Sequence, residues 1–322
     1  MTAFEGYPRL LGDVGATNAR WVWQAAPSPT LPAPRTYRCD DFASIEALID
    51  RCLADEAGAH PRSVAFGIAT PVDGDQVAMT NRDWNFSIAG LQARLGAERC
   101  LVLNDFAALA AGLPGLRDAD LRHLGGGPAR AGAPRVVLGP GSGLGVAALV
   151  TADGGRETVV EGEGGHATLA PGDAREDALL ARLRDTFGHV SAERALSGPG
   201  LVNLYRALCS LDGRMPDART PAEVTARAQA GTDAACVEAM QHFTGLLGSV
   251  AGNLALAFGA RAGVYLGGGI VPRLGSAFDA LMFRARFEAK GRFAGYLQRI
   301  PTYLITAPAP ALDGIARALD RR

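Results

Sequence analysis

Apolar runs broken by glycine-rich turns are the clearest pattern along this chain. Residues 10–23 (LLGDVGATNARWVW) and 136–150 (VVLGPGSGLGVAALV) each predict a strand, a turn with a hydroxyl residue and a second strand. Residues 263–274 (GVYLGGGIVPRL) predict a strand, a triple-glycine turn and the start of a helix. The first two segments resemble each other, which suggests two related halves; chance similarity of two glycine-rich hairpins is the alternative.

Between the first two turns, strands and helices alternate. Residues 42–53 carry apolar side chains at helical spacing, whereas 63–72 and 75–81 predict strands. Residues 100–114 predict a strand that runs into a helix of small apolar residues. This alternation favours an α/β fold built from βαβ units.

The second half of the chain is more helical. Residues 200–208 and 242–258 each place their large apolar side chains on one face, as expected for helices that pack on a core. Gly245, Gly248 and Gly252 would let the second of these helices approach a neighbour closely. A proline-rich loop and a last helix, within 306–319, are expected to close the chain.

Composition narrows the class of protein. The chain has 322 residues, of which 48% are hydrophobic and 20% charged, as in globular proteins, and its net charge of −1 argues against nucleic acid or an acidic membrane surface as a partner. Its five cysteines are scattered without a C-x-x-C pair, so neither a disulfide framework nor a zinc site is expected. No signal peptide or membrane span is predicted, and a cytoplasmic location is expected.

Glycine turns supply the first candidate chemistry. The chain contains neither the P-loop motif G-x-x-x-x-G-K-[ST] nor a complete G-x-G-x-x-G. The turns at Gly12–Thr17, Gly139–Gly145 and Gly267–Gly269 could instead hold phosphate oxygens with backbone N–H groups, aided by the hydroxyls of Thr17 and Ser142. An ordinary hairpin is the alternative for any one of these turns.

A second set of candidates is polar. Asn104 and Asp105 follow a predicted strand at the end where α/β sheets bind ligands. Together with Glu163, His166 and Glu193 they offer the amide, carboxylate and imidazole groups that bind sugar hydroxyls, and Asp105 could act as a general base. A metal site at Glu163 and His166, and a helix-capping role for Asp105, are the alternatives.

These segments occur in an order that resembles a known family. The motifs GDVGATNAR, MTNRDWNFSI, NDFAALAAGLP, GPGSGLGVAALV, GEGGHATLAP, SAERALSGPGLVNLYRAL and LGGGIVPRL are similar to those of the bacterial ATP-dependent glucokinases. That family belongs to the actin/hexokinase/Hsp70-type phosphotransferases. The resemblance runs from Leu10 to the last helix, and the zinc-binding cysteine cluster of the related repressor-type sugar kinases is missing.

The resemblance implies a fold, an activity and partners. It implies an α/β fold of two actin-like (ribonuclease H-like) domains that flank a cleft. The expected boundaries are 1–114 plus 304–322 for a small domain and 115–303 for a larger, more helical one. It implies transfer of the γ-phosphoryl group of ATP, with Mg²⁺, to the 6-hydroxyl of glucose. A homodimer is expected on the same ground.

The resemblance also assigns residues. It implies that Asp105 is the catalytic base and that glucose contacts Asn104, Asp105, Glu163, His166 and Glu193. The implied nucleotide-binding residues are Gly12, Asp13, Val14, Gly15, Ala16, Thr17, Gly141, Ser142, Gly143, Gly267, Gly268 and Gly269. Asp13 is implied to orient Mg²⁺ through water. Ala16 departs from the Gly-Gly-Thr that is usual in the first turn, and Pro140 stiffens the second.

Three alternatives to glucose phosphorylation by ATP stay open at this stage. The polar set does not choose among glucose, mannose, glucosamine and fructose. ADP or polyphosphate could replace ATP as the phosphoryl donor. A sugar sensor without catalysis is the alternative from another class, although no DNA-binding helix-turn-helix precedes Leu10.

Overall fold

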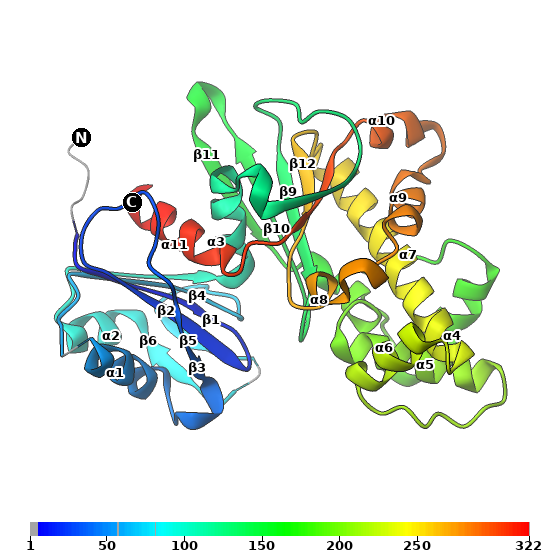
Figure 1. Cartoon of the computed structure of the whole chain (residues 1–322), viewed down its shortest axis with the longest axis horizontal. Helices are drawn as coiled ribbons and strands as arrows, with labels where there is room; N and C mark the ends of the chain where they lie inside the picture. Colours follow the sequence, from blue (N-terminus) through cyan, green and yellow to red (C-terminus); the bar gives the residue numbers. More distant parts are fainter. Residues whose placement is uncertain (1–5, 57, 81, 322) are drawn as a thin grey trace. The chain divides into compact units, whose positions relative to one another are not determined.

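The computed structural model describes residues 6–56, 58–80 and 82–321, which form two compact units. The first unit combines the chain up to Arg117 with the chain from Ala307 onward, and the second comprises Asp118–Thr306 (Figure 1). Each unit contains a sheet and helices. The predicted α/β class is therefore present in both, and the second unit is the larger and more helical one, as expected.

The first unit is built on a five-stranded sheet with the order β3-β2-β1-β4-β7. Its strands are β1 (Arg9–Val14), β2 (Asn18–Gln24), β3 (Arg35–Arg38), β4 (Ser63–Ile68) and β7 (Arg99–Asn104). Strands β1, β4 and β7 are parallel, and their register places Val14 beside Ile68 and Ile68 beside Asn104. The carboxyl ends of these three strands therefore share one edge of the sheet.

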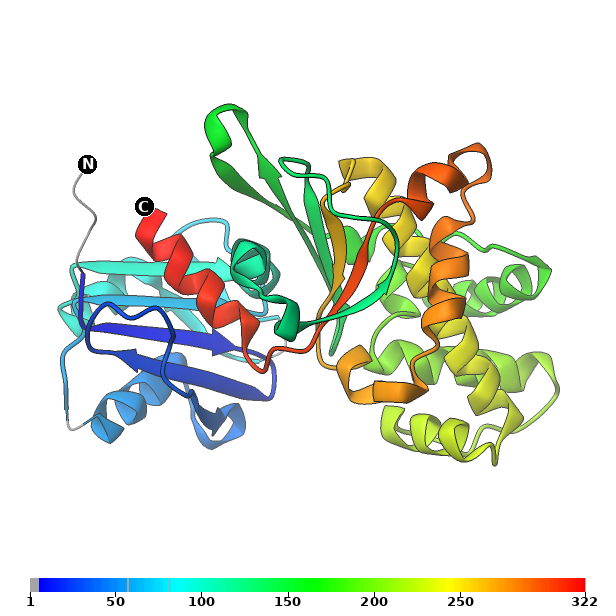
Figure 2. The same cartoon turned by 45° about the horizontal axis from the view of Figure 1, so that its top comes forward.

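Helices cover both faces of this sheet (Figures 1 and 2). On one face, α1 (Ile45–Asp55) and α2 (Ile88–Leu95) form a core with alternate strand residues such as Leu10. On the other face, α3 (Asp105–Gly112) and α11 (Pro310–Arg321) pack on residues such as Leu11. A short hairpin of β5 (Gln76–Ala78) and β6 (Asn85–Ser87) completes the unit.

The second unit contains a six-stranded sheet with the order β11-β10-β9-β12-β13-β8. The strands are β8 (Leu121–Gly125), β9 (Arg135–Pro140), β10 (Leu144–Thr151), β11 (Glu157–Gly162), β12 (Gly263–Leu266) and β13 (Thr302–Ile305). Strand β12 is parallel to both β9 and β13, and the remaining pairs are antiparallel.

Seven helices accompany this sheet among the described residues. They are α4 (Ala174–Phe187), α5 (Gly198–Leu211), α6 (Pro221–Ala230), α7 (Ala234–Phe258), α8 (Val271–Leu274), α9 (Ala280–Glu288) and α10 (Ala294–Gln298). A Cβ at Gly248 would overlap the Phe283 carbonyl, and one at Gly252 would overlap the Phe287 carbonyl. The predicted close approach of a glycine-bearing helix to a neighbour is thus confirmed between α7 and α9.

Most predicted elements are present, with shifted ends. The helix expected at 42–53 begins at Ile45, because the Ser44 side chain caps it by accepting the Ala47 N–H. The helix expected at 242–258 begins earlier, at Ala234. The strand expected at 75–81 is shorter: β5 ends at Ala78, and position 81 lies outside the described residues.

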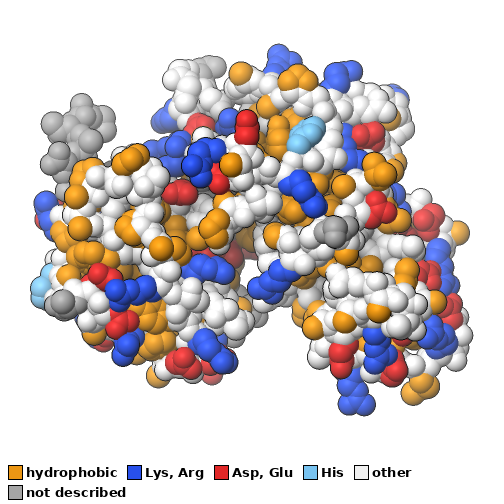
Figure 3. All heavy atoms as spheres, viewed as in Figure 1, with side chains coloured by type: hydrophobic (Ala, Val, Ile, Leu, Met, Phe, Trp, Pro, Cys, Tyr) orange, Lys and Arg blue, Asp and Glu red, His pale blue; other side chains and the backbone are white. Residues whose placement is uncertain are grey.

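The surface and the cysteines agree with the composition. Figure 3 shows basic and acidic side chains interspersed over the viewed face. All five cysteines are free thiols, as predicted, and four of them are buried. In the part of the chain that the structure describes, no helix has the length and apolar character needed to cross a membrane.

Candidate active site

A short turn of residues 15–17, the first glycine loop, joins β1 to β2. The Gly15 N–H donates to the Asn18 carbonyl at 3.0 Å, and the Thr17 side chain is exposed. Gly12 precedes the loop within β1, and a Cβ there would overlap the Trp21 ring, at 2.6 Å. Packing against tryptophan therefore already explains glycine at position 12.

Asp13 lies at the end of β1, opposite Arg20 on β2. The Arg20 Nη1 atom is 3.4 Å from Asp13 Oδ2, and the Asp13 side chain is 17% exposed. Burial raises the pKa of Asp13, and the nearby guanidinium of Arg20 opposes that shift. The position holds one carboxylate that is largely shielded from solvent and faces a single positive charge.

Asn104 and Asp105 lie where β7 becomes α3. The Asn104 Oδ1 atom accepts the N–H groups of Phe106 and Ala107, at 2.9 and 3.2 Å, so Asn104 is the N-cap of the helix. Asp105 is the first helical residue, and its Oδ1 atom accepts the Phe106 N–H at 2.9 Å. The alternative of Asp105 as the capping residue is wrong, because its neighbour holds that position.

The sheet brings the first glycine loop and Asn104 to the same edge. Val14 and Asn104 end strands that are separated only by β4. Two strand spacings correspond to about 10 Å between their backbones. The first glycine loop and Asp105 therefore lie at one edge of the same sheet.

In the second unit, Glu163, His166 and Glu193 come together. The His166 Nε2 atom lies 3.8 Å from Glu163 Oε2 and 4.0 Å from Glu193 Oε2. The Ala192 N–H donates to the Ala167 carbonyl at 2.9 Å and so joins the two turns that carry these side chains. The three side chains are 57%, 59% and 30% exposed, which leaves them open to a ligand.

Metal binding by this cluster has no structural support. Within residues 6–56, 58–80 and 82–321, no group of three or more His, Cys, Asp or Glu is arranged to hold a metal ion. Two acidic side chains around one imidazole remain suited to hydroxyl groups, since they accept hydrogen bonds and the ring can donate one.

The second and third glycine turns pack directly on each other. A Cβ at Gly139 would lie 2.5 Å from the carbonyl carbon of Gly267, and Gly268 has a φ of +76°. The Gly267 N–H donates to Leu138 O at 2.8 Å, and the Ile270 N–H donates to Pro140 O at 3.2 Å. Two predicted nucleotide-binding turns thus form one surface, on which glycine is sterically required.

The second turn also contacts the start of α5 and the acidic cluster. The Gly198 N–H donates to the Gly141 carbonyl at 2.8 Å, which places the beginning of α5 at this turn. The Leu144 N–H donates to Glu193 Oε2 at 2.9 Å, and a Cβ at Gly143 would overlap that carboxylate. Glu193 therefore belongs both to the acidic cluster and to the glycine turn.

The predicted site residues fall into two groups. The first glycine loop, Asp13, Asn104 and Asp105 belong to the first unit. The acidic cluster, Gly141–Gly143 and Gly267–Gly269 belong to the second. Within each unit the structure brings the predicted residues together.

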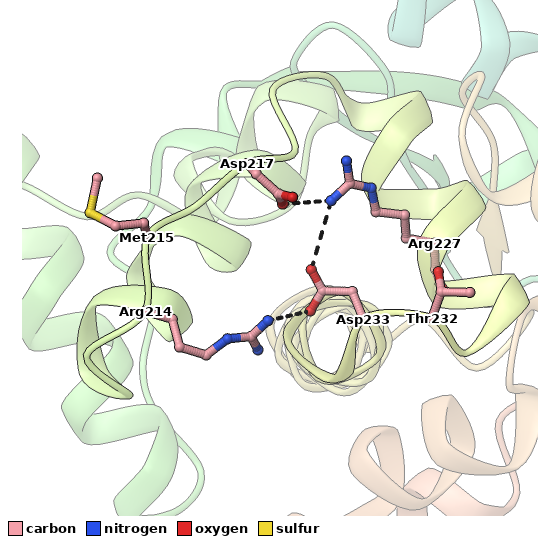
Figure 4. A pocket seen from close by; sticks show the side chains of 6 residues that line it. All are labelled: Arg214, Met215, Asp217, Arg227, Thr232 and Asp233. Carbon is pink, nitrogen blue, oxygen red and sulfur yellow. Dashed lines mark hydrogen bonds and ion pairs between the residues drawn. The ribbon is translucent and has the colours of Figure 1, made fainter.

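An open pocket of about 440 Å³ lies elsewhere in the second unit (Figure 4). It is found where α5 and α6 end and α7 begins, whereas the second glycine turn contacts the start of α5. Its charged side chains pair with each other: Arg214 with Asp233 at 3.1 Å, and Arg227 with Asp217 at 2.5 Å. None of the predicted site residues lines it.

Several polar contacts of the site were not anticipated. The Asn104 Nδ2 atom donates to Thr70 O at 3.3 Å, and the Thr70 hydroxyl donates to Ala78 O at 2.9 Å. Cys39 and Arg82 both contact the first glycine loop. Arg82 lies in the segment MTNRDWNFSI, whose similarity to the glucokinases was the only sequence signal for it.

Comparison with known proteins identifies the family of this chain. The profile of the glucokinase family matches residues 10–322. The glucokinase of Aromatoleum aromaticum is 53% identical over 315 residues, which cover 98% of this chain and 95% of that protein. The glucokinase of Chromobacterium violaceum is 49% identical, with coverage of 98% and 90%.

A solved structure extends the likeness to the fold. The crystal structure of a glucokinase from an Antarctic psychrotroph superposes with a TM-score of 0.86 at 32% identity, covering 98% of this chain and 99% of that one. The predicted two-domain α/β fold of the sugar kinases is confirmed by this match. The chain belongs to the glucokinase family.

Proposed function

We propose that this protein transfers the γ-phosphoryl group of ATP to the 6-hydroxyl of glucose, producing glucose 6-phosphate and ADP. Family membership over residues 10–322 supports the reaction class. The observation that carries the proposal is the shared sheet edge of the first glycine loop and Asn104–Asp105, which would bring a phosphate and a hydroxyl together.

In the proposed mechanism Asp105 is the general base. The oxygen of the 6-hydroxyl attacks the γ-phosphorus, the bond to the bridging oxygen of ADP breaks, and the hydroxyl proton passes to the Asp105 carboxylate. General-base assistance of this kind contributes about 10²- to 10⁴-fold. Because Asn104 caps the helix, Asp105 is held at its first turn without being needed as the cap.

The remaining polar residues would hold the sugar. Asn104, Glu163, His166 and Glu193 would contact its hydroxyl groups. Carboxylates accept hydrogen bonds only, whereas an imidazole can donate one and accept one. Such a set fixes the directions of hydroxyl groups, and it would orient the 6-hydroxyl for attack.

Backbone groups would hold the phosphates. The first glycine loop and the joined turns at Gly141–Gly143 and Gly267–Gly269 offer N–H donors without a lysine. The residues at the loop also fit Mg²⁺, because Asp13 supplies one shielded carboxylate, and Mg²⁺ in kinases binds one or two carboxylates plus the substrate phosphates. Mg²⁺ would offset the phosphate charge, with Asp13 orienting it through water.

A coupled assay tests the proposal. The intact protein is supplied with ATP and Mg²⁺, and ADP formation is followed with glucose, mannose, glucosamine and fructose in turn. We expect the highest kcat/KM for glucose, and a parallel series with ADP or polyphosphate as donor should show much lower rates. Tight glucose binding without any ADP formation would instead identify a sugar sensor.

Two finer assignments are also proposed. We propose that the two units are actin-like domains of the hexokinase and Hsp70 type, and that the protein is a homodimer. Family membership supports both. Light scattering coupled to size exclusion would test the second, since a monomeric mass of 33.4 kDa for the active species would contradict it.

A further inference from the structure

The carbonyl groups of the first glycine loop are held by two residues outside it. The Cys39 Sγ atom donates to Gly15 O at 3.5 Å, and the Cys39 N–H donates to Thr17 O at 2.9 Å. Between them, the Arg82 Nη2 atom donates to Ala16 O at 2.9 Å. Each of the three loop carbonyls therefore accepts a hydrogen bond from another residue of the first unit.

This engagement fixes where the N–H groups of the loop point. In a trans peptide the carbonyl of one residue and the N–H of the next point in opposite directions, and the only cis peptide among the described residues is at Tyr7–Pro8. The Gly15 carbonyl thus turns the Ala16 N–H away from Cys39, and the Ala16 carbonyl turns the Thr17 N–H away from Arg82. Neither N–H donates to another described residue. Successive N–H groups of this kind bind anions.

Arg82 is itself held in place. Its Nη2 atom also donates to Asp40 Oδ1 at 2.7 Å, and its guanidinium lies over the Trp84 ring at 5.0 Å. The Trp84 residue is 2% exposed and the Arg82 side chain 15% exposed. The hydrogen bond from Arg82 also lowers the pKa of Asp40, so this carboxylate is ionised at neutral pH and anchors the guanidinium.

We propose that Arg82 is a positioning residue for the phosphoryl donor. It fixes the peptide between Ala16 and Thr17 so that the Thr17 N–H faces the nucleotide phosphates. A charged donor on the Ala16 carbonyl also polarises this peptide and strengthens its N–H as a donor. The inference rests on the proposed function, in which the first glycine loop binds ATP.

The test compares nucleotide affinity with glucose kinetics. Binding of a non-hydrolysable ATP analogue to the intact protein is measured by titration calorimetry without glucose, and KM is measured for both substrates. Arg82→Ala should weaken analogue binding and raise the KM for ATP by about ten- to hundredfold, as for loss of a hydrogen bond to a charged group. The KM for glucose should stay unchanged.

Related variants separate positioning from folding. Arg82→Lys should give an intermediate affinity, because an ammonium group lacks the planar fork of the guanidinium. Asp40→Ala removes only the anchor, at a side chain that is 59% exposed, and should weaken binding by a smaller factor. The double variant should bind no more weakly than Arg82→Ala, since both changes act on one contact.

Arg94→Ala is the matched control. Arg94 pairs with Asp50 at 2.9 and 2.6 Å and joins α2 to α1 away from the loop. Its loss should therefore change neither the analogue affinity nor the KM for either substrate. Wild-type analogue affinity in Arg82→Ala, or equal rises in both KM values, would overturn the proposal. If a urea titration shows that Arg82→Ala does not fold, Asp40→Ala provides the test. Weaker analogue binding in that variant would support the proposal, and wild-type binding would overturn it. A wild-type protein without ATP-dependent glucose phosphorylation refutes the proposed function separately.

Discussion

The Glu193 Oε2 atom accepts the N–H of Leu144 at 2.9 Å and lies 4.0 Å from His166 Nε2. One carboxylate therefore contacts the backbone at the second glycine turn and an imidazole of the acidic cluster. A substitution at Glu193 should therefore affect the KM for both proposed substrates. The choice of variant can separate the two effects.

Glu193→Gln keeps an oxygen that can accept the Leu144 N–H but removes the charge beside His166. We expect it to raise the KM for glucose by about tenfold while the KM for ATP stays close to wild type. Glu193→Ala leaves the Leu144 N–H without its acceptor and should raise both KM values. Steady-state kinetics with each substrate varied in turn would check this, and equal effects of the two variants on the KM for ATP would contradict it.

Asp105→Asn should separate catalysis from stability. The amide can still accept the Phe106 N–H through Oδ1, and the Asn104 cap stays intact, so the free energy of unfolding should change little. The kcat should fall by about 10²- to 10⁴-fold, because an amide cannot accept the proton of the attacking hydroxyl. Urea unfolding and single-turnover kinetics measure the two effects, and a normal kcat in the folded variant would exclude Asp105 as the base.

Gly268→Ala should destabilise the second unit for two reasons. The residue has a φ of +76°, and a Cβ would lie 2.6 Å from the Pro140 carbonyl oxygen. Gly213→Ala is the matched control, since Gly213 has a φ of +66° and nothing within 4 Å of the added carbon. Backbone strain alone costs about 1–3 kcal/mol. Urea titration should show a larger loss of unfolding free energy for Gly268→Ala than for Gly213→Ala. Equal losses would mean that the second and third turns move apart for the added Cβ with no loss of stability.

We expect His242 to contribute to the free energy of unfolding in a pH-dependent way. It lies between Glu176 and Glu238, with ring nitrogens 3.5 Å from an oxygen of each, and its side chain is 12% exposed. The hydrogen bond with Glu176 raises the pKa of His242, although burial opposes the shift. A histidine with a raised folded-state pKa stabilises fully below its unfolded pKa, and the contribution is lost as the pH rises through the folded value.

His242→Gln should therefore lower the free energy of unfolding more at pH 6 than at pH 9. Urea titrations at both pH values measure the difference. His60→Gln, at an exposed position in the first unit, is the control and should show no such dependence. A loss for His242→Gln that is equal at the two pH values would indicate packing rather than charge.

Local sequence signals were sufficient to predict much of the fold and the placement of some candidate site residues at a strand end. Glycine between two apolar runs predicted the β1–β2 and β9–β10 hairpins, because turns between paired strands favour small residues. The apolar run before Asn104 placed this residue and Asp105 at the end of a strand. Helix ends were less well predicted. The apolar pattern of the first helix starts at Phe42, but α1 begins only at Ile45, because the Ser44 side chain caps it with a single hydrogen bond.

Only the tertiary structure determined which of the predicted turns and side chains contact one another. The contact of Gly139 with Gly267, the bond between Glu193 and Leu144, and the bond between Arg82 and Ala16 join residues far apart in the chain. No periodicity or turn signal specifies such pairs, because they depend on the order and register of the strands. The sequence alone therefore determined the α/β class, the turns and the chemistry of the side chains. Sheet packing determined which carbonyl and N–H groups are engaged and which remain available to a substrate.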